Sequence, residues 1–140
     1  MAGIKDLGTL LSSIDPILDE RSFVFCTFPE FHWDDVHQLN PIGFFHEKEG
    51  LTLIITQQEA IDKNINYESV YKLISLNVHS SLDAVGLTAA FSTKLAEKNI
   101  SVNVVAAYYH DHIFVPEEKA EQALAAISEF RLQSHPVRLK

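Results

Sequence analysis

The chain of 140 residues has a single cysteine, no long hydrophobic run and comparatively few basic residues. Because Cys26 is alone, an internal disulfide and any metal site built from cysteines are excluded, and a reducing compartment is indicated. No segment reaches the roughly 18 consecutive apolar residues of a membrane-spanning helix. Lys5 and Asp6 interrupt the N-terminal apolar run, so we expect no signal peptide there. We therefore expect a cytoplasmic protein that does not enter the membrane.

The shortage of positive charge also limits the partners. The chain has 11 Lys and Arg against 19 Asp and Glu, which gives a formal charge of -8. Such a surface repels phosphate backbones and anionic lipid, so neither nucleic acid nor a membrane surface is expected as a partner. What the chain does have is apolar residues, at 46%, which are enough for a core without disulfides or a structural metal.

In the second half of the chain, segments with the apolar pattern of a strand alternate with segments that have the apolar pattern of a helix. Alternating apolar residues predict strands, and apolar residues three or four positions apart predict amphipathic helices. The predicted order is strand, helix, strand, strand, helix, over residues 70–78, 83–98, 100–106, 113–115 and 116–130.

The first half is less regular. Its predicted elements are a helix over 4–14 that ends before Pro16, a strand over 22–28, a hairpin over 43–56 with Gly50 in its turn, and a helix over 57–63. Pro29–Asn40 lacks a steady period and is predicted to be a loop or one weak turn. We interpret its polar and aromatic residues as an exposed, solvated surface and not as an acid–base site: His32, Trp33, Asp34, Asp35 and His37.

A weak internal repeat connects the two halves. Residues 51–60 and 112–120 both read as a short strand, polar or acidic residues and the start of a helix. A β-α-β-β-α order builds an antiparallel sheet with both helices on one face, the α+β ferredoxin-like arrangement. We expect two such units in tandem, a degenerate one over 1–67 and a second over 68–131, followed by a tail over 132–140 in which 137–139 is the candidate for a final strand.

The segment from His79 to Thr88 links a predicted strand to a predicted helix. Free N–H groups at a helix start favour an anion, so a ligand carboxylate could dock there while Asp83 holds an ammonium group. Gly86 is unfavourable inside a helix and leaves room for a ligand or a neighbouring backbone. Ser80 and Asp83 also have the spacing of a capping box, so capping and ligand binding both stay open.

Two histidines flank Asp111. On a strand His110 and His112 would share a face, and His79 could complete a metal site of three histidines. Because the motif lies at a predicted turn and lacks a fourth ligand, turn-stabilising hydrogen bonds are the favoured interpretation. No nucleophile elbow or Gly-rich phosphate loop occurs, and Cys26 is expected to be an inert buried thiol. We therefore expect no catalytic residue, no cofactor and no metal ion.

Two longer stretches resemble a known family. Residues 71–90 read Tyr-Lys-Leu-Ile-Ser-Leu-Asn-Val-His-Ser-Ser-Leu-Asp-Ala-Val-Gly-Leu-Thr-Ala-Ala, and residues 103–116 read Asn-Val-Val-Ala-Ala-Tyr-Tyr-His-Asp-His-Ile-Phe-Val-Pro. Together with residues 23–27 and 47–53, they resemble the small bacterial proteins with tandem ACT domains, a family of unknown function related to the regulatory ACT domains of aspartate kinases. The similarity extends from Ile4 to Phe130.

The resemblance implies two ferredoxin-like ACT units that bind an amino acid or a similar small molecule at an interface between units. The family uses the loop between the first strand and the first helix, which corresponds here to His79–Gly86, with Asp83 meeting the ligand's ammonium group and the following amides its carboxylate. The candidate ligand residues are His79, Ser80, Ser81, Asp83, Ala84, Val85, Gly86 and Asn103.

The leading hypothesis is a non-catalytic regulatory module that binds a small molecule, with an amino acid as the expected ligand, and that forms a homodimer through sheet edges. One alternative is a protein-interaction module that keeps only the ACT fold. A less favoured alternative is a metal-binding protein or metal-dependent enzyme built around His110 and His112.

Overall fold

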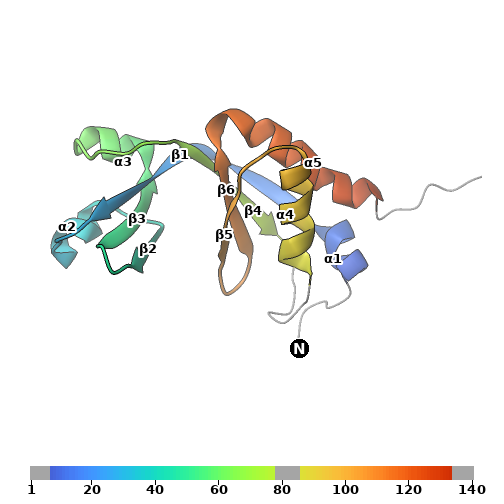
Figure 1. Cartoon of the computed structure of the whole chain (residues 1–140), viewed down its shortest axis with the longest axis horizontal. Helices are drawn as coiled ribbons and strands as arrows, with labels where there is room; N and C mark the ends of the chain where they lie inside the picture. Colours follow the sequence, from blue (N-terminus) through green and yellow to red (C-terminus); the bar gives the residue numbers. More distant parts are fainter. Residues whose placement is uncertain (1–6, 78–85, 134–140) are drawn as a thin grey trace, which may run out of the picture. The chain divides into compact units, whose positions relative to one another are not determined.

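The computed structural model describes residues 7–77 and 86–133 (Figure 1). Its elements in chain order are α1 (Leu7–Ser13), β1 (Asp15–Phe28), α2 (Trp33–Gln38), β2 (Gly43–His46), β3 (Leu51–Thr56), α3 (Gln57–Asp62), β4 (Tyr71–Asn77), α4 (Leu87–Glu97), β5 (Asn103–Ala106), β6 (Asp111–Pro116), a 3-10 turn η1 (Glu117–Lys119) and α5 (Ala120–Gln133). None of the helices described has the length and the apolar character needed to cross a membrane.

The chain divides into two compact units. The first, which we call the inserted unit, is Glu20–Lys72; the second, the split unit, consists of Met1–Asp19 and Leu73–Lys140. Two strands run through both units, because β1 passes the boundary after Asp19 and β4 passes it after Lys72. The split unit is therefore made of the two segments that precede and follow the inserted unit in the sequence.

The strand order is β2-β3-β1-β4-β6-β5, and the β1–β3, β2–β3 and β5–β6 pairs are antiparallel. The inserted unit takes its strands in the sequence β1, β2, β3, β4, and the split unit takes β4, β5, β6 and the first residues of β1. In each case the fourth strand lies beside the first, the first beside the third and the third beside the second, which is the order of a ferredoxin-like unit. The predicted α+β class with two ferredoxin-like units is confirmed.

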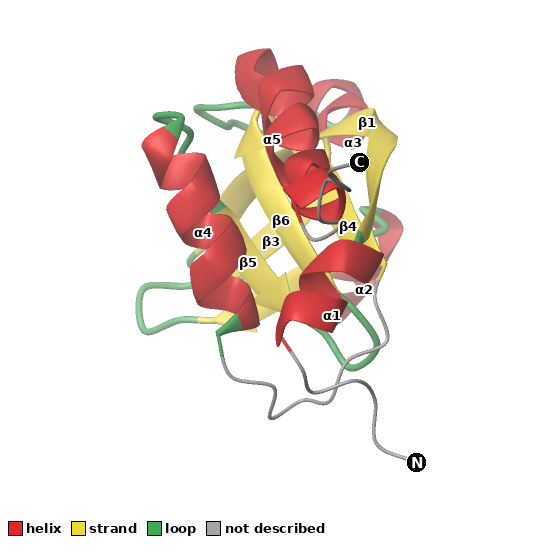
Figure 2. Cartoon of the chain, turned by 90° about the vertical axis from the view of Figure 1, so that its right-hand side faces the viewer, coloured by secondary structure: helices red, strands yellow, loops and turns green. Residues whose placement is uncertain are grey.

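The core of the split unit lies between its strands and its helices. Alternate residues of β4 and β6, Ile74, Leu76, Ile113 and Val115, point to one side of these strands. They pack against the apolar faces of α4 and α5, whose largest fully buried side chain is that of Phe91. Figure 2 shows α1, α4 and α5 on the same side of β4, β5 and β6.

The core of the inserted unit also lies between alternate residues of its strands and its helices. Val24 and Cys26 of β1 and the alternating residues Leu51, Leu53 and Ile55 of β3 face one side of the strands. The helices that cover this side contribute few large side chains: Val36 from α2, Leu39 directly after it, and Ala60 from α3.

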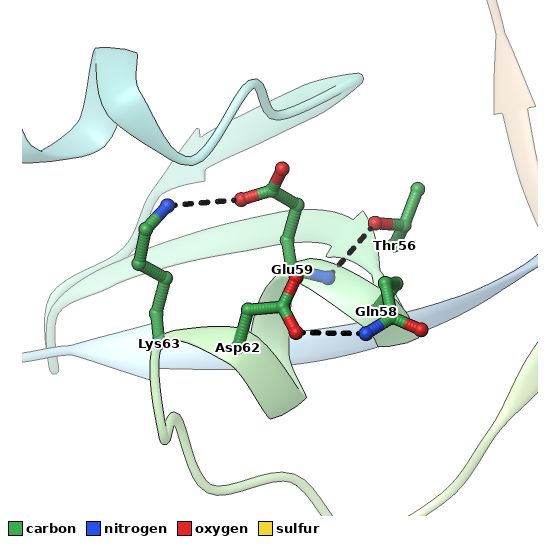
Figure 3. Close-up of polar contacts among 5 residues, drawn as sticks. All are labelled: Thr56, Gln58, Glu59, Asp62 and Lys63. Carbon is green, nitrogen blue, oxygen red and sulfur yellow. Dashed lines mark hydrogen bonds and ion pairs between the residues drawn. The ribbon is translucent and has the colours of Figure 1, made fainter.

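The hairpin and the helix after it form as predicted. Glu47 and Gly50 exchange two backbone hydrogen bonds across the turn between β2 and β3, with N–O distances of 2.9 and 3.2 Å. Thr56 then begins α3 as its N-cap, since its hydroxyl accepts a hydrogen bond from the Glu59 N–H at 3.1 Å (Figure 3). Two side-chain contacts, each between residues four positions apart, support the helix: the Lys63–Glu59 ion pair and the Gln58–Asp62 hydrogen bond.

The prediction of a loop or one weak turn over Pro29–Asn40 missed a helix, because residues Trp33–Gln38 form α2. This helix is six residues long and buries only Val36, with Leu39 buried just beyond its end. Two apolar residues three positions apart are too few to give a visible helical period. The inserted unit thus has the helix between its first two strands that the sequence did not reveal.

The first strand is longer than predicted, since β1 begins at Asp15 and not near Ser22. Its early residues include Asp19, Glu20 and Arg21, which do not look like a strand in the sequence. Leu18 packs against the core of the split unit, so this part of β1 supplies the fourth strand that the second half lacks in sequence. The tail with the candidate strand 137–139 lies outside the described residues, and the division at residues 67 and 68 stays a prediction.

Candidate ligand-binding site

The predicted ligand loop connects β4 to α4. The strand ends at Asn77 and the helix begins at Leu87, with Gly86 as its N-cap residue. Most of the predicted ligand residues lie outside the described residues: His79, Ser80, Ser81, Asp83, Ala84 and Val85. The proposed capping box of Ser80 and Asp83 therefore stays a prediction.

Gly86 is described, and it corrects the prediction that it lies inside the helix. Its backbone is left-handed, with φ 95° and ψ -9°, and its carbonyl accepts the first hydrogen bond of α4 from Ala90 N at 2.8 Å. Only glycine takes this conformation without a steric cost. Because glycine has no side chain to cap a helix, the first N–H groups of α4 need partners from the preceding loop, from water or from a ligand.

Asn103 is the other predicted ligand residue that the structure describes. It is the first residue of β5, is exposed, and lies opposite Phe114 of β6. The neighbouring pair, Val104 and Ile113, belongs to the core under the helices. Since side chains alternate along a strand, Asn103 lies on the other face of the sheet, away from the helices.

The same face carries a polar pair that the sequence did not predict. Ser75 Oγ of β4 lies 2.8 Å from His112 Nδ1 of β6. Burial lowers the pKa of His112, and the nearby His110 lowers that pKa further. The His110 Nδ1 atom is buried and has no hydrogen-bond partner among the described residues. The sequence shows Ser75 and His112 as polar residues beside apolar ones in their strands. It does not show that the two strands are neighbours.

The histidine motif shows no metal site in the described part. The rings of His110 and His112 are 6.5 Å apart, and His79 lies outside the described residues. Across residues 7–77 and 86–133, no group of three His, Cys, Asp or Glu side chains could hold a metal ion.

The inserted unit has its own junction between the first strand and the first helix, between Phe28 and Trp33. Four rings meet there, which we call the aromatic–histidine cluster: Phe31, Trp33, Phe44 and His46. Trp33 and Phe44 are 50% and 51% exposed, so the cluster is a surface feature. The prediction of an exposed surface holds for His32, Trp33, Asp34, Asp35 and His37, although Trp33–His37 lie on a helix.

A shallow pocket of about 570 Å³ also lies in the inserted unit. Its lining includes Phe25 and Tyr71, whose rings meet edge to face at 5.3 Å, together with Thr27 and Thr52. Cys26 borders it, but burial raises the pKa of this thiol to about 11. A thiol that keeps its proton at neutral pH is no nucleophile, as the sequence led us to expect.

Family comparisons agree with this architecture. ACT-domain family models match residues 2–72 and residues 68–129, so that together they cover both halves of the chain. No curated protein sequence matches the chain.

Several solved structures have the same fold. A Vibrio cholerae protein of unknown function, described as a possible transport protein, is 51% identical, with a TM-score of 0.83 over 93% of this chain and 99% of that one. The ligand-free regulatory subunit of aspartate kinase from Thermus thermophilus is 14% identical, with a TM-score of 0.57 over 86% of this chain and 97% of that one. Aspartate kinase from Clostridium acetobutylicum is 12% identical, with a TM-score of 0.60 over 84% of this chain and 34% of the kinase.

The last two similarities show the fold alone, whereas the family models and the Vibrio cholerae protein show relationship in sequence. The chain belongs to the ACT-domain family and carries two ACT domains in tandem.

Proposed function

We propose that this protein is a non-catalytic regulatory module that binds a small molecule, with a free amino acid as the ligand. The observation that carries the proposal is that two ACT-domain models account for residues 2–129, nearly the whole chain. The fold shared with the aspartate kinase regulatory subunit of Thermus thermophilus supports a regulatory role.

The proposed site is the segment between β4 and α4. Asp83 would hold the ligand's ammonium group, and the amides at the start of α4 would bind its carboxylate. Gly86 supports this assignment, because its left-handed backbone begins α4 without a capping side chain. The other proposed contacts are His79, Ser80, Ser81, Ala84, Val85 and Asn103.

We also propose a homodimer formed through the β5 edge of the sheet and a cytoplasmic location. The β5–β6 hairpin exposes Val105, Tyr108 and Tyr109, which are apolar or aromatic groups beside an edge strand. A reducing compartment suits a protein with one cysteine.

Thermal unfolding in the presence of each free amino acid tests the ligand. A ligand at one hundred times its Kd stabilises the folded state by about 2.7 kcal/mol, which for a chain of this length raises Tm by roughly 5–10 °C. Asp83→Ala should remove this response. Glu97→Gln, a change of an exposed acid at the other end of α4, should keep it. A panel without any stabilising amino acid would contradict the proposal, and so would an Asp83→Ala protein that responds like the wild type.

A protein-interaction module that keeps only the fold is the second candidate. It is favoured by the exposed aromatic side chains of Trp33, Phe44 and Phe45. Under this alternative no amino acid would change Tm, while a defined protein partner would.

A further inference from the structure

The aromatic–histidine cluster is a preorganised surface of the inserted unit. Trp33 meets Phe31, Phe44 and His46 with ring centroids 5.0, 5.4 and 5.7 Å apart, each close to edge-to-face. Phe44 and His46 are 5.8 Å apart at an interplanar angle of 87°. Such pairs hold one another in place, so rings that stay half-exposed can bind a partner with little loss of side-chain freedom.

Two of these rings belong to an edge strand. Within the part of the chain that the structure describes, β2 pairs only with β3 and ends the strand order. Phe44, Phe45 and His46 are exposed, and no residue of Gly43–His46 is Lys, Arg, Asp, Glu or Pro. Edge strands are commonly protected against further pairing by a lysine or a proline, and β2 has neither.

The charged residues next to the cluster and the strand in the sequence are mostly acidic. They are exposed and comprise five carboxylates and one ammonium group: Glu30, Asp34, Asp35, Glu47, Glu49 and Lys48. Asp34 and Asp35 directly follow Trp33, and Glu47 and Glu49 follow the strand itself. An aromatic surface beside carboxylates binds cations through ring faces and charge together.

We propose that the β2 edge binds an extended segment of a partner protein in which arginine or lysine alternates with apolar residues. The segment would add a strand beside Gly43–His46. Because side chains alternate along a strand, one set would lie over Phe44, His46 and Trp33 and the other over Phe45. The basic residues would meet the surrounding carboxylates.

A second copy of this chain is a poorer occupant of this edge. A two-fold pairing of β2 with β2 would bring together two surfaces that carry the same excess of acidic residues. Like charges held close together oppose association, whereas a basic segment neutralises them. This surface is separate from the proposed amino-acid site, so either proposal can fail alone.

Trp33 is the only tryptophan in the chain, so its fluorescence reports on the cluster directly. The full chain is titrated with an acetylated peptide of about six residues, arginine alternating with valine, long enough to cover the strand. We expect a saturable change in Trp33 fluorescence, with a Kd that rises between about 50 and 300 mM salt. Two control peptides should not bind: one with glutamate in place of arginine, and one with every backbone nitrogen methylated, which has no N–H group to donate to β2.

Paired variants locate the contact. Asp34→Asn with Asp35→Asn should weaken binding about tenfold, whereas Glu118→Gln with Glu121→Gln, exposed acids of the split unit, should leave Kd unchanged. If the first pair lowers Tm, Glu30→Gln with Glu49→Gln provides the same test outside the helix. Phe44→Ala should weaken binding, and Tyr108→Ala, at a more exposed ring elsewhere, should not.

Three results would overturn the proposal. The first is the absence of a saturable response to the arginine peptide. The second is equal binding of the methylated peptide, which would show that no strand is added. The third is a homodimer in sedimentation that Phe44→Ala dissociates, because the edge would then be occupied by a second copy.

Discussion

Ser75 and His112 join β4 to β6 by a side-chain contact of 2.8 Å between Oγ and Nδ1. The contact lies on the sheet face that the helices do not cover, where Ser75 is only partly buried. The neutral imidazole can either donate to the hydroxyl or accept from it. His110, whose buried Nδ1 has no hydrogen-bond partner among residues 7–77 and 86–133, lies next to this pair in sequence, with Asp111 between the two histidines.

The first prediction concerns the pH dependence of stability. Folding lowers the pKa of His112 below its ordinary value of 6.5, so the unfolded chain binds more protons just below that pH. This contribution to the free energy of unfolding is complete above pH 6.5 and is lost as the pH falls through the folded pKa. Because the ring is partly solvated, we expect a loss of less than about 1 kcal/mol.

Urea unfolding at about pH 7.5 and 5.5 measures the effect. His112→Gln should reduce the difference between the two pH values, and His37→Gln, at an exposed position on α2, should not. If His112→Gln leaves the difference as large as in the wild type, the histidine does not cause it.

The second prediction concerns Cys26. The thiol is buried with a pKa of about 11, so very little thiolate exists at neutral pH. Iodoacetamide should label the folded protein far more slowly than the urea-unfolded protein, as measured by mass spectrometry over time. Rapid labelling of folded protein would show that this part of the inserted unit opens readily.

The third prediction compares two glycines of one hairpin. A Cβ on Gly50 would lie 2.8 Å from the Phe28 carbonyl oxygen and 2.9 Å from Pro29 Cα, both backbone atoms that cannot move aside cheaply. We expect Gly50→Ala to lower the free energy of unfolding by about 2 kcal/mol or more. Gly43→Ala is the matched control, because its Cβ would meet only Ile54 Cδ1, at 3.6 Å, and should change stability by less than about 0.5 kcal/mol. Equal effects of the two variants in urea unfolding would contradict the crowding at Gly50.

The fourth prediction concerns the cap of α3. Thr56→Ala removes the acceptor of the Glu59 N–H and should cost about 1 kcal/mol of unfolding free energy. Thr56→Ser keeps the hydroxyl and should restore most of that loss. A serine variant as unstable as the alanine variant would mean that the methyl group of Thr56, and not its hydroxyl, stabilises the helix start.

The sequence predicted the elements whose apolar residues repeat within one segment. Ile74 and Leu76 mark β4, and Leu87, Phe91 and Leu95 mark α4, because each set is buried at the spacing of its own element. The hairpin around Gly50 was equally clear, since its turn residues separate two apolar runs.

What the sequence could not predict depends on partners that lie far along the chain. The early part of β1 becomes a strand because Leu18 packs in a core made mostly of residues beyond Leu73. The Ser75–His112 pair likewise requires knowing which strands are neighbours. For the ligand loop, the structure adds the conformation of Gly86 and the face of Asn103, and Asp83 rests on the sequence pattern and the resemblance.

The division of β1 between the two units has a consequence during synthesis. Residues 7–19 leave the ribosome before the whole of the inserted unit, yet the strands and helices that they pack against follow only after Leu73. The inserted unit can begin to collapse while the apolar residues Ile14 and Leu18 still have no core to enter. The nascent chain must therefore keep this early strand from pairing elsewhere until α5 has been made.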